Sequence, residues 1–182
     1  MNDLLSRAMR LLSQRDHSEA ELRRKLAAQP FVAKARFGGK GPHAPTSPTS
    51  PTSPTSPTSP TVAEEPVDPA LIDQVIVYCY QHNWLDDKRF AHSYIGSRSR
   101  KGYGAQRIRS ELMQKGVDKA LVQDALAECD IDWCEQAKQV AQRKFGDALP
   151  TDWKEKAKVQ RYLLYRGFFQ EEIQSIYRDF AQ

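Results

Sequence analysis

The segment from Ser97 to Gly104 brings together residue types that bind anions. It carries three cations, two serine hydroxyls, a tyrosine and two glycines, and it directly precedes a stretch with helical periodicity. The N–H groups at a helix N-terminus attract negative charge, and glycines let the backbone approach a ligand closely. We therefore expect Arg98, Arg100, Lys101 and Tyr103 to contact a phosphate backbone or an acidic protein surface.

Basic residues are concentrated in particular segments of the chain. Residues 87–116 hold eight Lys and Arg against two Asp and Glu, whereas residues 117–135 hold one basic and six acidic residues. If the helices of these segments stack, their basic faces align into a stripe that could follow a phosphate backbone or an acidic groove. The candidate contact residues are Arg23, Arg24, Arg98, Arg100, Lys101, Tyr103, Arg107, Arg109, Lys115, Lys158, Arg161 and Arg166.

Each single charge also has a simpler explanation. Solvated helix faces carry many charges, and acidic helix starts with basic helix ends complement the helix dipole. The net charge is only +4, which is mild for a protein that binds bare nucleic acid. The functional interpretation therefore depends on the pattern of charge and not on its sum.

We find no set of residues that predicts catalysis. The candidates are Gly102-x-Gly104, Asp16-His17, Asp86-Asp87, Cys129 and Cys134. The glycine pair lacks the preceding strand and third glycine of a dinucleotide site, and no P-loop motif occurs. The acidic residues stand where helix caps belong, and the cysteines lack ligand-spaced partners for zinc. We expect no enzyme activity, no cofactor and no metal.

The elements that must position these residues are helices. Nearly every segment outside one proline-rich tract has apolar residues at helical spacing, and we count nine helices and no strand. Ser18 with Glu21, Asp68-Pro69 and Asp152 with Glu155 are helix-start signals. The sequence predicts an all-α protein. Three tryptophans near helix starts are expected to pack between helices or repeats: Trp84, Trp133 and Trp153.

The helices repeat in groups of three. The apolar pairs Leu22/Leu26, Ile108/Leu112 and Val159/Leu163 match one another, and eight residues beyond the first member of each pair stand Pro30, Gly116 and Gly167. The period is about 50 residues once residues 29–66 are left out. We predict three tandem three-helix repeats of helix-turn-helix-like type, at 1–82, 83–130 and 131–182, in an elongated body that can curve.

Residues 29–66 form a proline-rich insertion in repeat one. Five Thr-Ser-Pro units run from Thr46 to Pro60, without any apolar side chain other than proline. Such a tract favours extended polyproline-like conformations and cannot build a core, so we expect it to be disordered. We interpret it as a surface-loop insertion between the second and third helices; a role as a Pro-rich ligand is the alternative.

Other classes of protein are excluded by composition. No stretch approaches the length of a membrane span, and the first residues lack the apolar core of a secretory signal. The odd count of three cysteines argues against a disulfide scaffold and favours a reducing compartment. We expect a cytoplasmic protein without membrane contact.

Several motifs closely resemble the RecX family. They are Arg15-Asp-His-Ser-Glu-Ala-Glu-Leu-Arg-Arg-Lys-Leu26, Trp84-Leu-Asp-Asp-Lys-Arg-Phe90, Ser97-Arg-Ser-Arg-Lys-Gly-Tyr-Gly104, Ile108-Arg-x-Glu-Leu112, Lys115-Gly116 and Leu163-Leu-Tyr-Arg-Gly-Phe168. The resemblance covers nearly the whole chain except residues 29–66, and the family fold is three tandem three-helix repeats.

The resemblance implies a cytoplasmic, monomeric regulator of the RecA recombinase. Such proteins lodge in the groove of the RecA filament on single-stranded DNA and restrain filament growth, ATP hydrolysis, strand exchange and the SOS response. It implies no catalytic residue and no cofactor. Two other readings follow from the residues alone: a helix-turn-helix-like module that binds bare DNA tightly and with strong salt dependence, and a hydrolase, for which no residue set exists.

Overall fold

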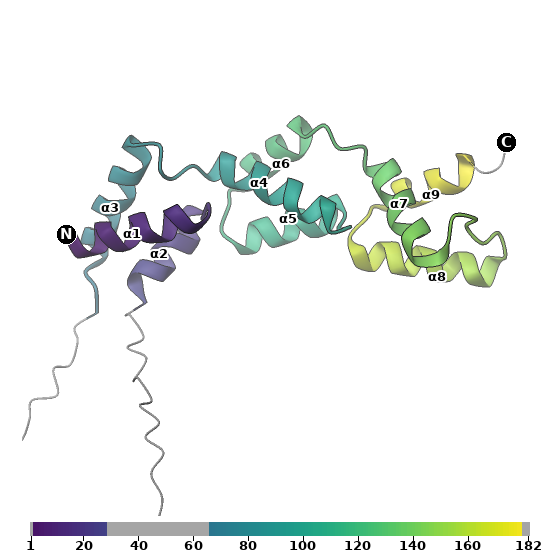
Figure 1. The fold of residues 1–182 in the computed structure, drawn as a ribbon, viewed down its shortest axis with the longest axis horizontal. Helices are drawn as coiled ribbons and strands as arrows, with labels where there is room; N and C mark the ends of the chain where they lie inside the picture. The colour runs from purple at the N-terminus through teal and green to yellow at the C-terminus, as the bar shows by residue number, and fades with distance from the viewer. Residues whose placement is uncertain (1, 29–65, 180–182) are drawn as a thin grey trace, which may run out of the picture.

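The computed structural model describes residues 2–28 and 66–179 as an elongated all-α body (Figure 1). Within these residues there are nine helices and no strand, as predicted. The helices are α1 (Asn2–Gln14), α2 (Glu19–Ala27), α3 (Pro69–Gln81), α4 (Asp87–Arg100), α5 (Ala105–Gln114), α6 (Lys119–Glu128), α7 (Trp133–Phe145), α8 (Trp153–Arg166) and α9 (Gln170–Asp179). The predicted insertion lies outside the described residues except for Pro66.

Most helices begin at a capping side chain that the sequence supplies. Asp68, Asp118 and Asp152 each accept a hydrogen bond from a backbone N–H of the first turn. Asp86, and not Asp87, caps α4, because its carboxylate accepts from two N–H groups at the start of that helix. Such caps satisfy donors that have no partner inside the helix, so they fix where each helix starts.

The predicted capping pairs form only in part. Ser18 accepts a hydrogen bond from the Glu21 N–H, but the Glu21 carboxylate binds Arg15 instead of returning to the Ser18 backbone. Glu155 pairs with Lys158 one turn further along α8. In both cases the Ser or Asp cap is present, and the acidic residue is used elsewhere.

Three separate apolar cores divide the helices into consecutive groups of three. The first core joins α1, α2 and α3, the second α4, α5 and α6, and the third α7, α8 and α9. Leu22, Ile108 and Val159 are each fully buried, one in each core. The three tandem three-helix repeats predicted from the sequence are therefore confirmed, while the predicted boundaries at 82/83 and 130/131 remain our own division of the chain.

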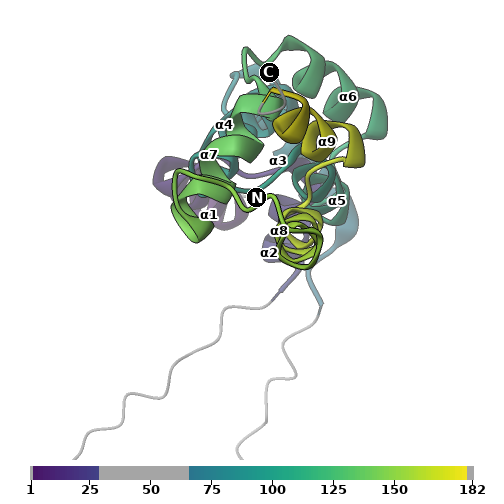
Figure 2. The ribbon, with the colours of Figure 1, turned by 90° about the vertical axis from the view of Figure 1, so that its right-hand side faces the viewer.

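Corresponding helices of the three repeats lie in rows along the body. In Figure 1 the second helices, α2, α5 and α8, follow one another along the lower edge, and in the end-on view of Figure 2 they lie close together. We call α2, α5 and α8 the second-helix column. This arrangement matters for function because the basic residues predicted to bind a partner are concentrated on these helices or beside them.

The tryptophans differ in their surroundings. Trp84 packs against the first core, with its ring centroid 5.7 Å from that of Tyr78. Trp133 contacts both the second and the third core and so bridges two repeats. The expectation of packing is wrong for Trp153, whose side chain is 73% exposed at the start of α8.

Candidate interaction surface

The second and third repeats join end to end through backbone groups. The N–H of Gly104, which caps α5, donates to the carbonyl of Arg166 at the end of α8, with 2.9 Å between N and O. The N–H of Gln106 donates to the Gly167 carbonyl at 3.0 Å. The backbones approach so closely that a Cβ on Gly104 would lie 2.3 Å from the Gly167 oxygen. The C-terminus of α8 therefore abuts the N-terminus of α5.

The first and second repeats join in the same direction through side chains. The Ser18 hydroxyl donates to the carbonyl of Lys115, just beyond α5, at 2.6 Å. The N–H of Glu19 donates to the carboxylate of Asp87 at 2.8 Å. A Cβ on Gly116 would lie 2.3 Å from the Ala20 Cβ. The C-terminus of α5 thus abuts the N-terminus of α2, and the dipoles of all three helices run the same way.

This geometry occupies part of the predicted anion site at the start of α5. Two N–H groups of that helix start, those of Gly104 and Gln106, already donate to carbonyl oxygens of the third repeat. A phosphate placed there would have to displace these carbonyls. The helix start is a joint between repeats, so any partner must be bound by side chains around it.

Tyrosines and arginines surround the joint between the second and third repeats. The guanidinium groups of Arg98, Arg107 and Arg166 lie 5.0, 4.7 and 5.2 Å from the centroid of the Tyr103 ring. Arg98 also lies over Tyr94, and Arg166 over Tyr162, both at 5.3 Å. We call these six residues the tyrosine–arginine cluster. Cation–π contacts of this kind each contribute about 0.5–1 kcal/mol where solvent reaches them.

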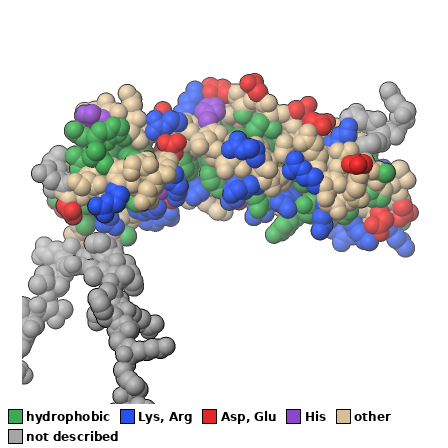
Figure 3. Space-filling model, in the orientation of Figure 1, with side chains coloured by type: hydrophobic (Ala, Val, Ile, Leu, Met, Phe, Trp, Pro, Cys, Tyr) green, Lys and Arg blue, Asp and Glu red, His purple; other side chains and the backbone are tan. Residues whose placement is uncertain are grey.

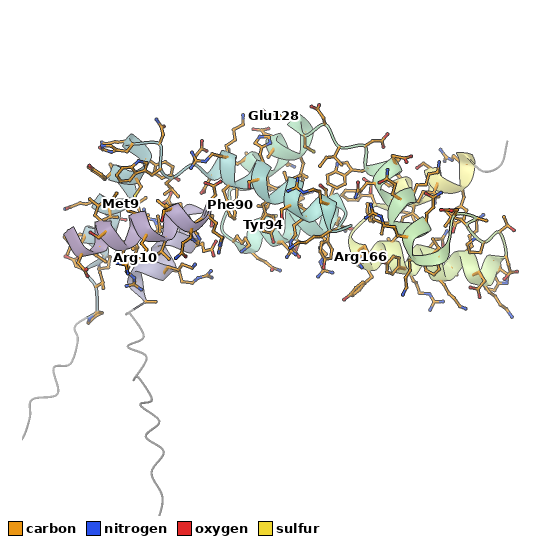
Figure 4. The ribbon with its side chains drawn as sticks, viewed as in Figure 1. Met9, Arg10, Phe90, Tyr94, Glu128 and Arg166 are labelled. Carbon is orange, nitrogen blue, oxygen red and sulfur yellow. The ribbon has the colours of Figure 1, made fainter. Side chains whose placement is uncertain are left out.

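The cluster draws residues from two repeats. Figure 4 labels Tyr94 on α4 and Arg166 at the end of α8, which lie on either side of the joint. Because Arg166 stacks on Tyr103 while its neighbour Gly167 contacts α5, the cluster ties the orientation of the third repeat to that of the second.

One carboxylate, that of Glu111, neutralises part of the cluster. It accepts hydrogen bonds from the Tyr94 hydroxyl and from Nε of Arg107, and its Oε2 lies 2.8 Å from Nε of Arg98. Burial alone would raise the pKa of Glu111, but these donors and cations outweigh it, so the pKa lies below its usual value. Glu111 is therefore charged at neutral pH, and it holds Arg98 and Arg107 in place.

A similar buried carboxylate lies beside the other joint. Glu21 is 5% exposed, and Nδ1 of buried His17 lies 3.3 Å from its carboxylate. Burial by itself would raise the pKa of Glu21, but contacts with Arg15 and His17 and the nearby Lys115 lower it to about 2. Burial also lowers the pKa of His17, so this imidazole is neutral at physiological pH.

The predicted contact residues divide into two groups. Among the described residues, the side chains of Arg24, Arg100, Lys101 and Arg109 have no hydrogen-bond, ion-pair or ring partner. The others are already engaged: Arg23 with Glu19 and Asp73, Arg98 and Arg107 with Glu111, Lys115 and Arg166 with tyrosine rings, Lys158 with Glu155, and Arg161 with the Ala157 carbonyl. The four unpaired cations can bind a partner protein or nucleic acid, whereas the paired cations hold neighbouring side chains in place.

The structure brings some of the predicted residues together and separates others. Arg98, Tyr103, Arg107 and Arg166 meet at one joint, whereas Arg23 and Arg24 lie at the far end of the column, beside the start of α3. Figure 3 shows basic side chains recurring along the lower part of the body and acidic ones over α6 near the upper edge. The predicted stripe of basic residues is therefore discontinuous, and its densest part lies at the joint between repeats two and three.

Sequence reasoning missed the tyrosines other than Tyr103. Tyr94, Tyr162 and Tyr165 each lie beneath a guanidinium of the cluster. A signal was available in the spacing Tyr-x-x-x-Arg, which occurs three times, at Tyr94, Tyr103 and Tyr162. Residues four apart on a helix face each other, so this spacing places a cation over Tyr94 in α4 and over Tyr162 in α8, whereas Tyr103 lies in the turn between α4 and α5.

Two further properties of the described residues bear on the kind of protein this is. No group of three or more His, Cys, Asp or Glu side chains between residues 2–28 and 66–179 is arranged to hold a metal ion. No helix in the same ranges is long and apolar enough to cross a membrane.

The fold and this surface define an all-α protein of tandem three-helix repeats whose second helices stack end to end. The chain also matches sequence profiles of the first, second and third three-helix domains of RecX, at residues 5–31, 86–126 and 130–176. Curated relatives agree with this assignment. The chain belongs to the RecX family.

Relatives and solved structures cover nearly the whole chain. Regulatory protein RecX of Serratia proteamaculans is 81% identical over the full length of both chains, and that of Yersinia enterocolitica is 66% identical over the full length of both. The crystal structure of RecX from Lactobacillus salivarius has the same fold, with a TM-score of 0.63 at 18% identity over 98% of this chain and 97% of that one. The family is thus one of regulatory proteins.

Proposed function

We propose that this protein regulates the RecA recombinase by binding RecA filaments on single-stranded DNA. It lodges in the helical groove of the filament and restrains filament growth, ATP hydrolysis, strand exchange and the SOS response. It acts in the cytoplasm as a monomer. The family assignment supplies the regulatory role, and the second-helix column supplies a surface suited to it.

The observation that carries the proposal is the end-to-end stacking of α2, α5 and α8. Helices of 9, 10 and 14 residues placed in one line span about 50 Å, at 1.5 Å of rise per residue. A rigid surface of this length can contact more than one subunit of a helical polymer. A regulator that bridges subunits can hold them in one arrangement, which opposes the changes that hydrolysis and strand exchange require.

The free cations supply the attraction. Arg24, Arg100, Lys101 and Arg109 can pair with carboxylates of RecA or with phosphates of the DNA in the filament without breaking a hydrogen bond, ion pair or ring contact among the described residues. The engaged cations of the tyrosine–arginine cluster keep the joint rigid, so little ordering remains to oppose binding. The acidic residues of two third helices, Asp124 and Glu128 in α6 and Glu171 and Glu172 in α9, are suited to basic surfaces of the filament.

The direct test is RecA's DNA-dependent ATP hydrolysis, measured with and without this protein, beside a titration of the protein with bare DNA at several salt concentrations. We expect hydrolysis to fall at protein concentrations where bare DNA remains mostly unbound. The matched control is the same assay with bovine serum albumin at equal mass.

Two other results would each point elsewhere. Unchanged hydrolysis together with tight, strongly salt-dependent binding to bare DNA would favour the helix-turn-helix-like DNA-binding function. Unchanged hydrolysis without DNA binding would contradict both functions.

A further inference from the structure

Four exposed apolar side chains gather around the joint between the second and third repeats. Met113, Leu164, Tyr165 and Phe169 are 46%, 45%, 73% and 40% exposed. Leu164 and Tyr165 line a hollow on one side of α5, and Met113 and Phe169 line a hollow on the other side. Large apolar side chains that gather on a surface, and are not scattered singly, mark interaction sites.

The two hollows share one wall. Gln106, Ser110 and Gln114 line both of them, so this exposed ridge of α5 separates the two apolar pairs. These three side chains are polar but uncharged. We call the ridge with its four apolar neighbours the joint face.

The charge around the joint face is positive. Arg109 lines the hollow of Met113 and Phe169 and has no partner among the described residues. Arg107 lines the other hollow. Among the described residues, Glu111 is the single carboxylate that lines either hollow, and it is already bound by a tyrosine and two arginines. An occupant with negative charge would therefore meet no unpaired acidic group.

We propose that the joint face binds an acidic, amphipathic segment of a partner protein. Apolar side chains of that segment fill the two hollows, and its carboxylates pair with Arg109 and the neighbouring cations. We take the occupant to be protein because Met113 and Leu164 offer no ring to a base and the shared ridge carries no charge for a phosphate backbone. Met, aromatic and Arg side chains are together enriched at protein interfaces. Stacking of bases on the exposed rings of Tyr165 and Phe169 is the alternative that the crosslinking test below separates.

This inference deepens the proposed function and rests on it, since it assigns the joint face as the place where RecA is held. The experiment therefore measures filament binding and the contact site separately. The chain offers a matched control in Met9 of α1, which is 45% exposed, compared with 46% for Met113, and lies in repeat one (Figure 4).

The test places the photoreactive residue p-benzoylphenylalanine at position 113, 169 or 9 in the full-length protein. Each variant is mixed with RecA filaments on single-stranded DNA, sedimented to record binding, irradiated and digested for mass spectrometry. We expect all three variants to bind, and crosslinks to RecA from positions 113 and 169 but not from position 9. The crosslinked RecA peptides should combine Asp or Glu with apolar residues at helical spacing.

Each of the other outcomes would overturn the joint face as the contact site, the charge argument or the proposed function. Filament binding without a crosslink from positions 113 and 169 would remove the joint face while leaving the proposed function intact. Crosslinks to DNA would assign the face to nucleic acid, and a basic RecA peptide would contradict the charge argument. Absence of filament binding by the unmodified protein would overturn the proposed function and this inference with it.

A second variant pair measures the strength of the contact. Met113→Glu brings a carboxylate to an occupant that is itself acidic, so we expect filament affinity to fall about tenfold or more. Met9→Glu makes the same change at matched exposure and should leave affinity within about twofold. Equal effects of the two substitutions would contradict the assignment.

Discussion

The two joints between repeats are held together by different chemical groups. At the joint between repeats two and three, backbone N–H groups at the start of α5 donate directly to the carbonyls that end α8. At the joint between repeats one and two, the Ser18 hydroxyl and the Asp87 carboxylate stand between the two backbones. The joint between repeats two and three, the backbone joint, therefore depends on main-chain hydrogen bonds beside Gly104 and Gly167. The joint between repeats one and two, the side-chain joint, depends on particular side chains in addition to the close approach of Gly116 to Ala20.

The difference determines how each joint can fail. Where backbone meets backbone, any added Cβ must displace main-chain atoms, which cannot give way without moving a whole repeat. Where a side chain forms the contact between two repeats, its removal leaves a gap that water can enter. We expect substitutions to be most damaging at Gly104 and Gly167, in the joint between repeats two and three. Removal of a side chain in the joint between repeats one and two should be milder.

The largest effect is expected for Gly167→Ala. Gly167 has a φ of +94°, which L residues rarely adopt, and a Cβ there would lie 2.2 Å from the Arg107 Cβ. We expect the free energy of unfolding in urea to fall by about 3–4 kcal/mol. Gly146→Ala is the control, because Gly146 also has a positive φ, +98°, but open space around it. A loss of the same size in both variants would show that the joint contact contributes nothing.

Gly104→Ala tests the same joint without the dihedral strain, since the φ of Gly104 is −83°. A Cβ would meet three backbone atoms of Gly167 and Phe168 within 2.5 Å, so we expect a loss of about 3 kcal/mol in the same urea experiment. Gly96→Ala in α4 makes only an ordinary 3.5 Å contact and should raise stability by up to about 1 kcal/mol. Wild-type stability for Gly104→Ala would mean that the repeats are not held this closely.

A smaller effect is expected for Ser18→Ala at the side-chain joint. The hydroxyl both caps α2 and donates to the Lys115 carbonyl, so its removal should cost about 2 kcal/mol of unfolding free energy. Asp118→Ala removes a cap that serves α6 alone and should cost about 1 kcal/mol. The difference between these two losses measures the joint bond, and equal losses would contradict its role.

How much of this was visible in the sequence depends on whether the signal is local. Asp68 and Asp152 before apolar runs, and Gly116 and Gly167 after them, mark helix ends because capping acts within one turn. The repeat became visible once residues 29–66 were left out of the spacing. The joints were not predictable, because hydrogen bonds between Gly104 and Arg166 join groups that every residue possesses.

The candidate surface was predictable only in part for the same reason. Charge runs located the basic segments, but they could not separate Arg109, which has no partner in the described part of the chain, from Arg107, which Glu111 holds. That distinction depends on which carboxylate lies nearby in space. Exposure of Trp153 was equally hidden, since its apolar character alone predicts burial.

The last effect concerns pH and compares Glu21, which is buried, with Glu111, which is partly buried, beside the two joints. The pKa of Glu21 is about 2 in the folded protein and near 4.5 when unpaired. Its charged form therefore stabilises the fold above pH 4.5, and this stabilisation is lost as the pH falls toward 2. Glu111, whose pKa is also lowered, acts in the same direction.

We expect the slope of unfolding free energy against pH between 4.5 and 2 to become shallower in Glu21→Gln, by at most about 1.4 kcal/mol per pH unit. Glu111→Gln should change the slope in the same sense. His17 adds to the acid sensitivity below pH 6.5, since its lowered pKa favours the neutral imidazole in the fold. An unchanged slope in Glu21→Gln would contradict the role of its carboxylate.

The central claim is that Arg24, Arg100, Lys101 and Arg109, which lie on or beside the second-helix column, bind the RecA filament. It is tested most directly by RecA's DNA-dependent ATP hydrolysis with the variant Arg24→Glu/Arg100→Glu/Lys101→Glu/Arg109→Glu. The control variant, Arg10→Glu/Lys119→Glu/Arg143→Glu/Arg178→Glu, makes the same change in net charge on α1, α6, α7 and α9, at cations that also have no partner among the described residues.

Both variants should keep the wild-type helical content, because no hydrogen bond, ion pair or ring contact among the described residues is removed. The first should lose about 1–2 kcal/mol of unfolding free energy at most, because Arg100 and Lys101 stand at the C-terminal end of α4. We predict that the first variant loses inhibition of hydrolysis while the control keeps most of it. Wild-type inhibition by the folded first variant, or equal loss in both, would contradict the claim.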